Sequence, residues 1–359
     1  METYWEWFCS IPGIYRTQRE ILLHCFHTPL KLWEASEEEL LYLRDRGCGW
    51  ITKVMDYRKK CSPENAADEH RAQGIAFVSV EQEQYPKRLL PLRDRPYGLF
   101  YKGELPPEDV KTVAVVGARV CTPGGRAMAE AVAGEVVRAG GVVVSGAAYG
   151  IDGAAQWAAI EAGGKSYGVL GCGPDICYPS SHRQLFDRLI EDGGLISEFP
   201  PGTKALPTHF PMRNRIISGL SDAVAVVEAR KKSGSLITAE FALDQGRMVY
   251  AVPGRPDDSL SYGCNELISQ GAGLILSAES FAEAVFPDYK KRAKKSSANI
   301  TLAPTEKLVY SSLGFHGKSL WELEENTALS LSDLSDSLLS LELKGLAKET
   351  EQNFYVKVK

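Results

Sequence analysis

The sequence has little of what marks a membrane, secreted or disulfide-built protein. No stretch approaches the roughly 18 consecutive apolar residues of a membrane-spanning helix. The first residues, METYWEWF, lack the basic start of a signal peptide. Eight cysteines are present, without a C-x-x-C pair or the dense spacing of a disulfide framework, so we expect reduced thiols. Together these absences predict a cytoplasmic protein.

Nucleotide-binding and metal-binding signatures are also missing. No G-x-x-x-x-G-K-[ST] motif occurs, and Gly117, at the end of the first Val-rich run, is followed by Ala118 and Arg119 instead of continuing as G-x-G-x-x-G. No paired catalytic base or metal-ligand cluster stands out. We therefore expect no cofactor, no metal and no catalytic residue. The formal net charge of -5 excludes a polycation, so any nucleic acid must bind to a local basic patch.

What the sequence does contain, from about residue 110, is a repeated β–α pattern. Uninterrupted Val-rich runs are typical of strands buried on both faces. They are Val113 to Val116, Val142 to Val144, Tyr167 to Leu170, Leu195 to Ile196, Ala223 to Val227 and Met248 to Val252. Helical periodicity covers 126–138, 151–162, 181–191, 212–220 and 234–246. This order requires right-handed crossovers, so it predicts an α/β fold with a doubly wound, mostly parallel sheet.

Two flanking regions differ from this pattern. Residues 1–70 carry apolar side chains at helical spacing and predict a small N-terminal helical domain. Its turn Gly47-Cys48-Gly49 fits a helix-hairpin-helix contact with DNA, but it fits an ordinary packing turn better. Residues 71–288 hold the α/β domain, and the basic stretch within 289–301 predicts a linker.

The last residues, 302–359, form a third predicted domain. Helices are expected near 304–313, 320–325 and 330–345, followed by a β tail at 354–356, an order that resembles a winged helix. The third helix, LSLSDLSDSLLSLELKG, is acidic and Ser-rich, so it lacks the basic face of a major-groove reader. A protein-contact or accessory role is therefore favoured.

Phosphate-binding candidates follow the ends of the predicted strands, because backbone N–H groups point outward there. Gly117 and Arg119 follow the first strand, and Ser145 and Gly146 end the second. Together they offer amides, a hydroxyl and a guanidinium to an anion. Asp152 comes shortly afterwards, and we interpret it as a helix cap rather than a catalytic acid.

The segment from His209 to Ile217 gathers cations and an aromatic ring at a helix start. Arg213 and Arg215 stand two residues apart, and arginine suits phosphate oxygens. Phe210 can stack on an unpaired base, as in proteins that bind single strands. Lys204, His209 and Arg119 could extend this basic track. The alternative is that one of the two arginines pairs internally with Glu198 or Glu228.

These segments resemble the DNA-processing protein A (DprA, also called Smf) family. The resemblance spans roughly residues 80–290 and rests on VAVVGAR, SGAAYGID, GVLGCGPDICYP and the run FPMRNRIISGLSDAVAVVEARKKSGSLITAEFALDQGRMVYAVPG. It implies an extended Rossmann-like protein that binds single-stranded DNA, protects it, and helps to load RecA recombinase during natural transformation. It also implies a homodimer formed through the end of the Rossmann-like domain, near Tyr262 to Ile268.

The resemblance also assigns site residues. In relatives, the positions of Arg119, Phe210, Arg213, Asn214 and Arg215 line a basic DNA pocket, and Lys204 stands just upstream in a similar place. With the donors near the strand and helix ends, the full set expected to bind DNA is Gly117, Arg119, Ser145, Gly146, Lys204, His209, Phe210, Arg213, Asn214, Arg215 and Ser233. The chain departs from its relatives at Gln156, where they usually have histidine, and at His182, where they have asparagine, so we assign neither a required chemical role. The alternative function is a phosphoribohydrolase-like enzyme, for which Glu240 is the only acid in a comparable place.

Overall fold

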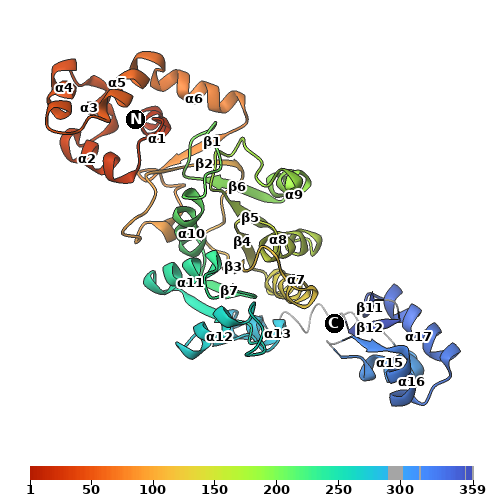
Figure 1. Ribbon diagram of the computed structural model, residues 1–359. Helices are drawn as coiled ribbons and strands as arrows, with labels where there is room; N and C mark the ends of the chain where they lie inside the picture. Colours follow the sequence, from red (N-terminus) through yellow and green to blue (C-terminus); the bar gives the residue numbers. More distant parts are fainter. Residues whose placement is uncertain (290–301, 315–316, 352, 358–359) are drawn as a thin grey trace. The chain divides into compact units, whose positions relative to one another are not determined.

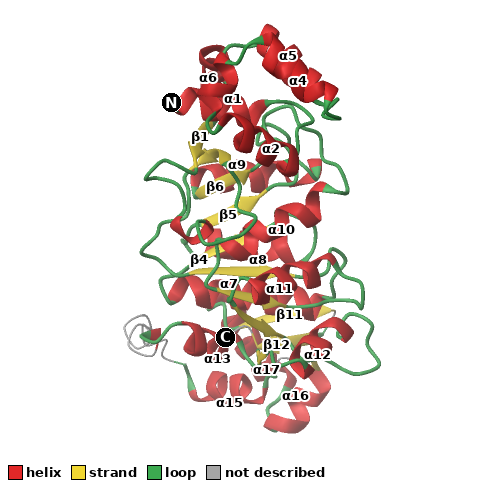
Figure 2. Cartoon of the chain, turned by 90° about the vertical axis from the view of Figure 1, so that its left-hand side faces the viewer, coloured by secondary structure: helices red, strands yellow, loops and turns green. Residues whose placement is uncertain are grey.

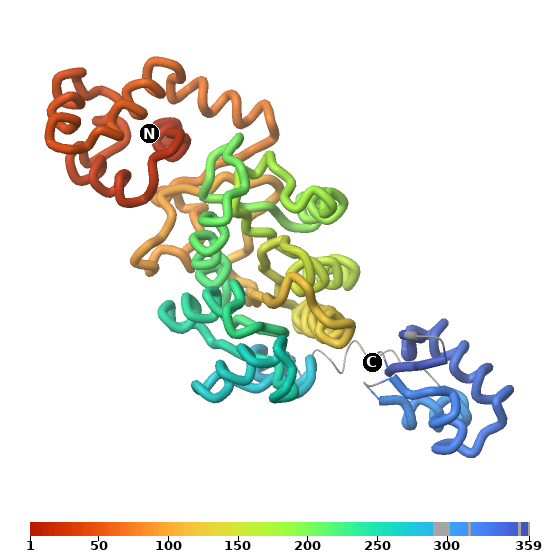
Figure 3. Tube along the Cα trace, in the orientation of Figure 1, coloured from red at the N-terminus to blue at the C-terminus, as the bar shows by residue number. Residues whose placement is uncertain are grey.

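The computed structural model describes residues 1–289, 302–314, 317–351 and 353–357. These residues belong to two compact units, Met1–Lys294 and Lys295–Lys359, whose chain paths are drawn in Figures 1 and 3. All but the first residue of the predicted linker, 289–301, lies outside the described residues. No helix in the described residues is both long and apolar enough to cross a membrane.

The N-terminal region is helical, as predicted. Its helices are α1 (Glu2–Ser10), α2 (Arg16–Phe26), α3 (Pro29–Glu34), α4 (Glu37–Asp45), α5 (Ile51–Lys60) and α6 (Pro63–Ala72). Trp7, Phe8 and Leu22 are buried between them, in a core that also includes Phe77 and Phe100 of the first two strands. Because helices and strands share this core, the predicted domain boundary at residues 70/71 stays a proposal.

A nine-stranded sheet organises the rest of the first unit (Figure 1). Its strands, in chain order, are β1 (Ala76–Ser79), β2 (Gly98–Gly103), β3 (Thr112–Val116), β4 (Val142–Ser145), β5 (Ser166–Val169), β6 (Gly193–Ser197), β7 (Ala223–Val226), β8 (Met248–Ala251) and β9 (Gly273–Leu274). The spatial order is β1-β2-β6-β5-β4-β3-β7-β8-β9. In this order, all neighbours from β6 through β5, β4, β3, β7 and β8 to β9 are parallel, whereas β1 pairs antiparallel with β2, and β2 pairs antiparallel with β6.

Helices cover both faces of this sheet (Figure 2). They are α7 (Pro123–Arg138), α8 (Ile151–Glu161), α9 (Arg183–Glu191), α10 (His209–Gly219), α11 (Gly234–Asp244), α12 (Tyr262–Ser269) and α13 (Ala278–Val285). Alternate side chains of β3 separate the two cores. Val113 and Val115 pack against α7, α8 and α13, while Ala114 and Val116 pack with α10, α11 and α12. The fold is therefore the predicted doubly wound, Rossmann-like sheet.

The strand order reverses between β3 and β7. From β3 the chain adds β4, β5 and β6 on one side, then returns to place β7 and β8 on the other. At such a switch point the loops after neighbouring strands leave in opposite directions and open a crevice. The topology thus places a binding crevice beyond the carboxyl ends of β3 and β7.

The described residues of the second unit form three helices and a small sheet. The elements are α15 (Pro304–Ser312), β10 (Lys318–Ser319), α16 (Leu320–Thr327), α17 (Leu331–Leu343), β11 (Ala347–Glu351) and β12 (Phe354–Lys357), with sheet order β10-β12-β11. Lys344, the one cation of the predicted third helix, donates to both oxygens of Glu306 at 2.6 Å. It is therefore engaged within the unit, and the winged-helix assignment remains a proposal.

Candidate nucleic-acid interface

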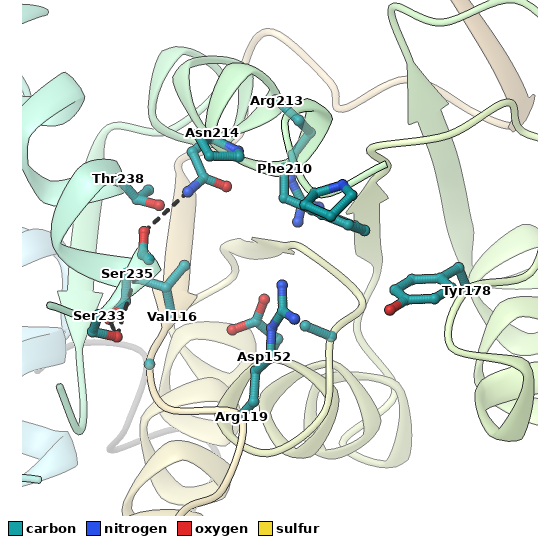
Figure 4. A pocket seen from close by; sticks show the side chains of 15 residues that line it. Val116, Arg119, Asp152, Tyr178, Phe210, Arg213, Asn214, Ser233, Ser235 and Thr238 are labelled. Atoms are coloured by element: carbon teal, nitrogen blue, oxygen red, sulfur yellow. Dashed lines mark hydrogen bonds between the residues drawn. The ribbon is translucent and has the colours of Figure 1, made fainter. Parts of the chain in front are cut away.

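A pocket of about 420 Å³ lies at the switch point. The loops after β3, β4, β5 and β7 and the starts of α10 and α11 enclose it (Figure 4). Its lining residues are Val116, Gly117, Arg119, Ala148, Asp152, Tyr178, Pro207, Phe210, Pro211, Arg213, Asn214, Ser233, Gly234, Ser235 and Thr238. Six of the eleven predicted site residues are among them: Gly117, Arg119, Phe210, Arg213, Asn214 and Ser233.

The helix that follows β3 is closed to anions by the protein's own carboxylate. Glu228 accepts hydrogen bonds from the backbone N–H of Thr122, at 3.0 Å, and from its hydroxyl, at 2.5 Å. Thr122 is the N-cap of α7, and a side chain at Gly125 would collide with the Glu228 carboxylate. In dinucleotide-binding folds this helix start holds the pyrophosphate. Here Glu228 supplies the negative charge instead.

The start of α8 carries the second carboxylate. Asp152 is buried in the first turn, and its Oδ2 accepts the Gly146 N–H at 3.1 Å. Asp152 is therefore not the predicted helix cap: the N-cap of α8 is Gly150, without a side-chain cap hydrogen bond, and the Asp152 carboxylate is directed back to the end of β4. Burial raises the pKa of Asp152, while Arg213 and the hydrogen bond from Gly146 oppose that rise. An anion at the floor of the pocket would face this acid.

The start of α11 is open. Ser233 is the N-cap, and its hydroxyl lies 2.8 Å from that of Ser235. A Cβ built at Gly234 would meet nothing within 4 Å, so the backbone there is accessible. Asn214 donates to the Gly234 carbonyl at 3.0 Å and so fixes α10 against this turn. The helix presents two hydroxyls and a positive dipole end, which suit a phosphate.

Arg119 supplies an exposed cation to the pocket. Its guanidinium carbon lies 5.3 Å from the centre of the Phe210 ring, and it makes no ion pair with the residues that the structure describes. Figure 4 shows it extending from the loop after β3 toward α10. Tyr178 stands next to Phe210, with ring centres 5.4 Å apart. One guanidinium and two rings therefore share the mouth of the pocket.

Arg213 lines the pocket but is not a free cation. It is 4% exposed and donates through Nη1 to the backbone oxygens of Gly146, at 2.9 Å, and Val169. Burial lowers its pKa to about 10, and the nearby Asp152 counteracts this. Its Nε has no hydrogen-bond partner among the described residues. Arg213 thus braces the ends of β4 and β5 and retains one unused donor.

The predicted DNA contact of Arg215 disagrees with its position in the structure. It is 5% exposed and does not line the pocket. Its Nη2 donates to both oxygens of Glu198 at 2.8 Å, and its Nε lies 3.1 Å from Asp94. The internal pairing considered as an alternative, with Glu198, is the one observed. Arg215 ties α10 to the loops after β6 and before β2.

Four further predicted residues lie outside the pocket lining. The Ser145 hydroxyl donates to the Val115 carbonyl at 2.6 Å and is fully buried. His209 is buried and stacks on Phe199. A side chain at Gly146 would come within 2.6 Å of Asp152 and 2.7 Å of Arg213. These three shape the site from behind, whereas Lys204 is exposed and able to meet a ligand.

A basic loop, Arg230-Lys231-Lys232, was not among the predicted site residues. All three residues are exposed and make no ion pair with a described residue. They directly precede Ser233, and Lys231 lies 5.2 Å from the centre of the Tyr262 ring. Three consecutive cations before a helix start were visible in the sequence as ARKKSG. Their position at a strand's carboxyl end was the signal that could have identified them.

A family model, curated relatives and two solved structures point to one family. The family model described as "DNA recombination-mediator protein A" matches residues 76–286. DNA processing protein DprA of Bacillus subtilis is 45% identical over 60% of this chain and 72% of its own length. DprA of Streptococcus pneumoniae superposes with a TM-score of 0.67 at 35% identity, covering 79% of this chain and 98% of that structure.

A second solved structure bears on the ligand. It is DprA of Helicobacter pylori, which matches with a TM-score of 0.53 at 29% identity, covering 59% of this chain and 97% of that one. That structure is described as giving insight into a unique single-stranded DNA binding mode. Protein Smf of a Synechocystis strain is 29% identical and spans 97% of this chain.

Proposed function

Because the chain belongs to the DNA recombination-mediator protein A family, we propose that its pocket binds the sugar–phosphate backbone of single-stranded DNA and catalyses no reaction. The observation that carries this proposal is the pairing of Arg119, an exposed guanidinium, with the open start of α11 across one pocket. The single-stranded DNA binding named for the Helicobacter pylori relative supports it.

The proposed contacts divide by chemistry. A phosphate binds between Arg119 and the hydroxyls of Ser233 and Ser235, where charge-assisted hydrogen bonds form. A base stacks on the rings of Phe210 and Tyr178, which requires that the base is unpaired. Duplex DNA keeps its bases stacked internally, so it can use only the phosphate contacts. The pocket should therefore favour single strands.

Asp152 sets the depth to which the strand enters. Its buried carboxylate would repel a phosphate at the floor, so the backbone stays at the rim and only a neutral sugar or base edge fits deeper. This arrangement is typical of binding. A phosphoribohydrolase-like reaction would need Glu240, but that residue lies on the exposed side of α11 and outside the pocket lining.

Replacing Arg230, Lys231 and Lys232 together with serine should weaken DNA binding and reduce the dependence of the affinity on salt. Each phosphate neutralised by a cation adds about 0.7 to the slope of log K against log salt for single strands, so the triple variant should lose about 2 of that slope. Binding of oligothymidylate across a salt series measures this. Lys59→Ser with Lys60→Ser, on exposed positions of α5, should leave the slope unchanged. An unaltered slope in the triple variant would remove the basic loop from the interface.

We also propose a homodimer formed through α12 and the sheet edge beside it. Strand β9 ends the sheet, and exposed apolar side chains occur on α12, on β9 and just after it: Tyr262, Leu274 and Leu276 are 41%, 48% and 72% exposed. Apolar side chains left exposed at a sheet edge are available for an interaction surface. Two pockets on one strand raise the effective concentration of the second contact.

Leu276→Asp is expected to convert the dimer into a monomer, because it places a charge in the apolar contact. Sedimentation velocity would show the change in mass. Affinity for a long oligonucleotide should fall, while affinity for an oligonucleotide that fills one pocket should not. A wild-type chain that sediments as a monomer at every concentration contradicts the proposal.

We further propose that the protein delivers the bound strand to RecA recombinase. The family's description as a recombination mediator supports it. A mediator that holds only the backbone can be replaced on the strand by a recombinase. Both proteins would meet in the cytoplasm. Filament formation by RecA on strands covered with this protein is the direct assay.

A further inference from the structure

An aromatic pair stands beside the pocket, on the loops after β4 and β5. Tyr149 follows Ala148, which lines the pocket, and it is 46% exposed. Its ring lies edge-on to His182, with ring centres 5.0 Å apart. His182 follows Tyr178, a pocket residue, by four positions. The pair therefore adjoins the wall formed by Ala148 and Tyr178.

Both rings are held in place by polar contacts at their far ends. The Tyr149 hydroxyl lies 2.8 Å from the Ser181 hydroxyl, which joins the two loops. Nδ1 of His182 lies 3.2 Å from the Ala147 carbonyl, and the ring packs on the first turn of α8, where a Cβ at Gly153 would come within 2.9 Å of it. A ring already fixed in orientation loses little conformational entropy when a flat ligand stacks on it.

A cation accompanies the pair. Arg183, the next residue, begins α9, is exposed, and makes no ion pair with any described residue. The fold needs neither this guanidinium nor the exposed part of the Tyr149 ring. An exposed ring, followed on the supporting loop by an unpaired cation next to His182, matches a nucleotide, whose base is flat and whose phosphate is anionic.

We infer that Tyr149, supported by His182, is a second base-stacking position, and that Arg183 binds the adjoining phosphate. This inference rests on the proposed function and extends it. The strand crosses the carboxyl edge of the sheet from the basic loop after β7, through the pocket, to the loops after β4 and β5. Its ligand is an unpaired nucleotide next to the one in the pocket, of any base, since every base has a stacking face.

The test combines protein variants with abasic substitutions in an oligothymidylate of about 12 nucleotides, within the usual site size for such proteins. Tyr149→Ala should weaken binding about fivefold to about a hundredfold, the range for removing one stacking partner. Tyr149→Phe should bind nearly as wild type, because the ring remains. Tyr42→Ala, which removes an exposed tyrosine on α4, should have no effect.

An abasic site at one position of the strand should weaken wild-type binding as much as Tyr149→Ala does, and the two changes together should cost no more than either alone. Arg183→Ala should lower the salt slope by about 0.7. Equal losses in Tyr149→Phe and Tyr149→Ala, or full additivity at every abasic position, would overturn the inference. If Arg119→Ala weakens binding as expected while Tyr149→Ala is neutral, only this second position fails. If the wild type does not bind single strands, the proposed function itself fails.

Discussion

Arg119→Ala should reduce the affinity for single-stranded DNA about tenfold to about a hundredfold, because hydrogen bonds to a charged group contribute about 1.5–3 kcal/mol. Arg119 is the exposed guanidinium inside the pocket, and its removal also uncovers one face of Phe210. The salt slope should fall by about 0.7 as one phosphate contact is lost. Fluorescence anisotropy with a labelled oligothymidylate measures both quantities.

The fold should not change in this variant, since Arg119 makes no ion pair with a described residue. Arg71→Ala is the matched control, because Arg71 is likewise an exposed arginine, on α6, and its ion-pair partner is Asp68. Arg119→Lys tests geometry: a lysine keeps the charge but loses the planar fork, so it should recover part of the affinity. Wild-type affinity and slope in Arg119→Ala would show that the strand binds elsewhere.

Arg215→Ala should lower the free energy of unfolding by about 3–5 kcal/mol, the usual cost of breaking a buried ion pair. The change leaves the Glu198 carboxylate, 14% exposed, without its partner. Urea denaturation of the variant and the wild type compares the two. Any loss of DNA binding should follow the unfolded fraction and disappear under stabilising conditions.

A rescue variant separates this structural role from a role in binding. Arg215→Met combined with Glu198→Met replaces the pair by apolar side chains and should recover part of the stability. It should also bind DNA normally once folded. A stable Arg215→Ala variant that has lost DNA affinity would instead place Arg215 in the interface, against its observed pairing.

The regular elements of the first unit's core were predictable because their patterns were strong. The Val-rich run at 113–116 became β3, and the helices expected at 151–162 and 234–246 became α8 and α11 within a few residues. Strands β1 and β2 were not predicted. They are short, antiparallel and separated by a long connection, so they are not part of the β–α repeat by which the other strands were predicted.

The pocket was predictable only in part. Local sequence places Gly117, Arg119 and Phe210 at the ends of elements, which was enough to bring them together. It could not separate the roles of Arg213 and Arg215. Residues two apart on a helix do not share a face, so one arginine turns to the pocket wall and the other to Glu198. The partner acid comes from a loop far from α10 in sequence.

The occupation of the α7 N-terminus by Glu228 was equally unpredictable from the sequence. Glu228 lies more than a hundred residues after Thr122, and only the sheet order places β7 next to β3 and so brings them together. This contact closes the helix after β3, and the proposed function therefore places the anion at the helix after β7. A motif search of the first loop alone would have found neither the closed site nor the open one.

The proposed function requires a preference for single-stranded over double-stranded DNA and binding that responds to salt. Wild-type protein should be titrated with an oligonucleotide and with its duplex of equal length, across a series of salt concentrations. We expect log K to fall linearly with log salt, with a slope of about 0.7 for each phosphate contacted, and tighter binding of the single strand at every concentration. Equal affinity for both forms, or affinity that does not change with salt, would contradict a pocket built for an unpaired strand.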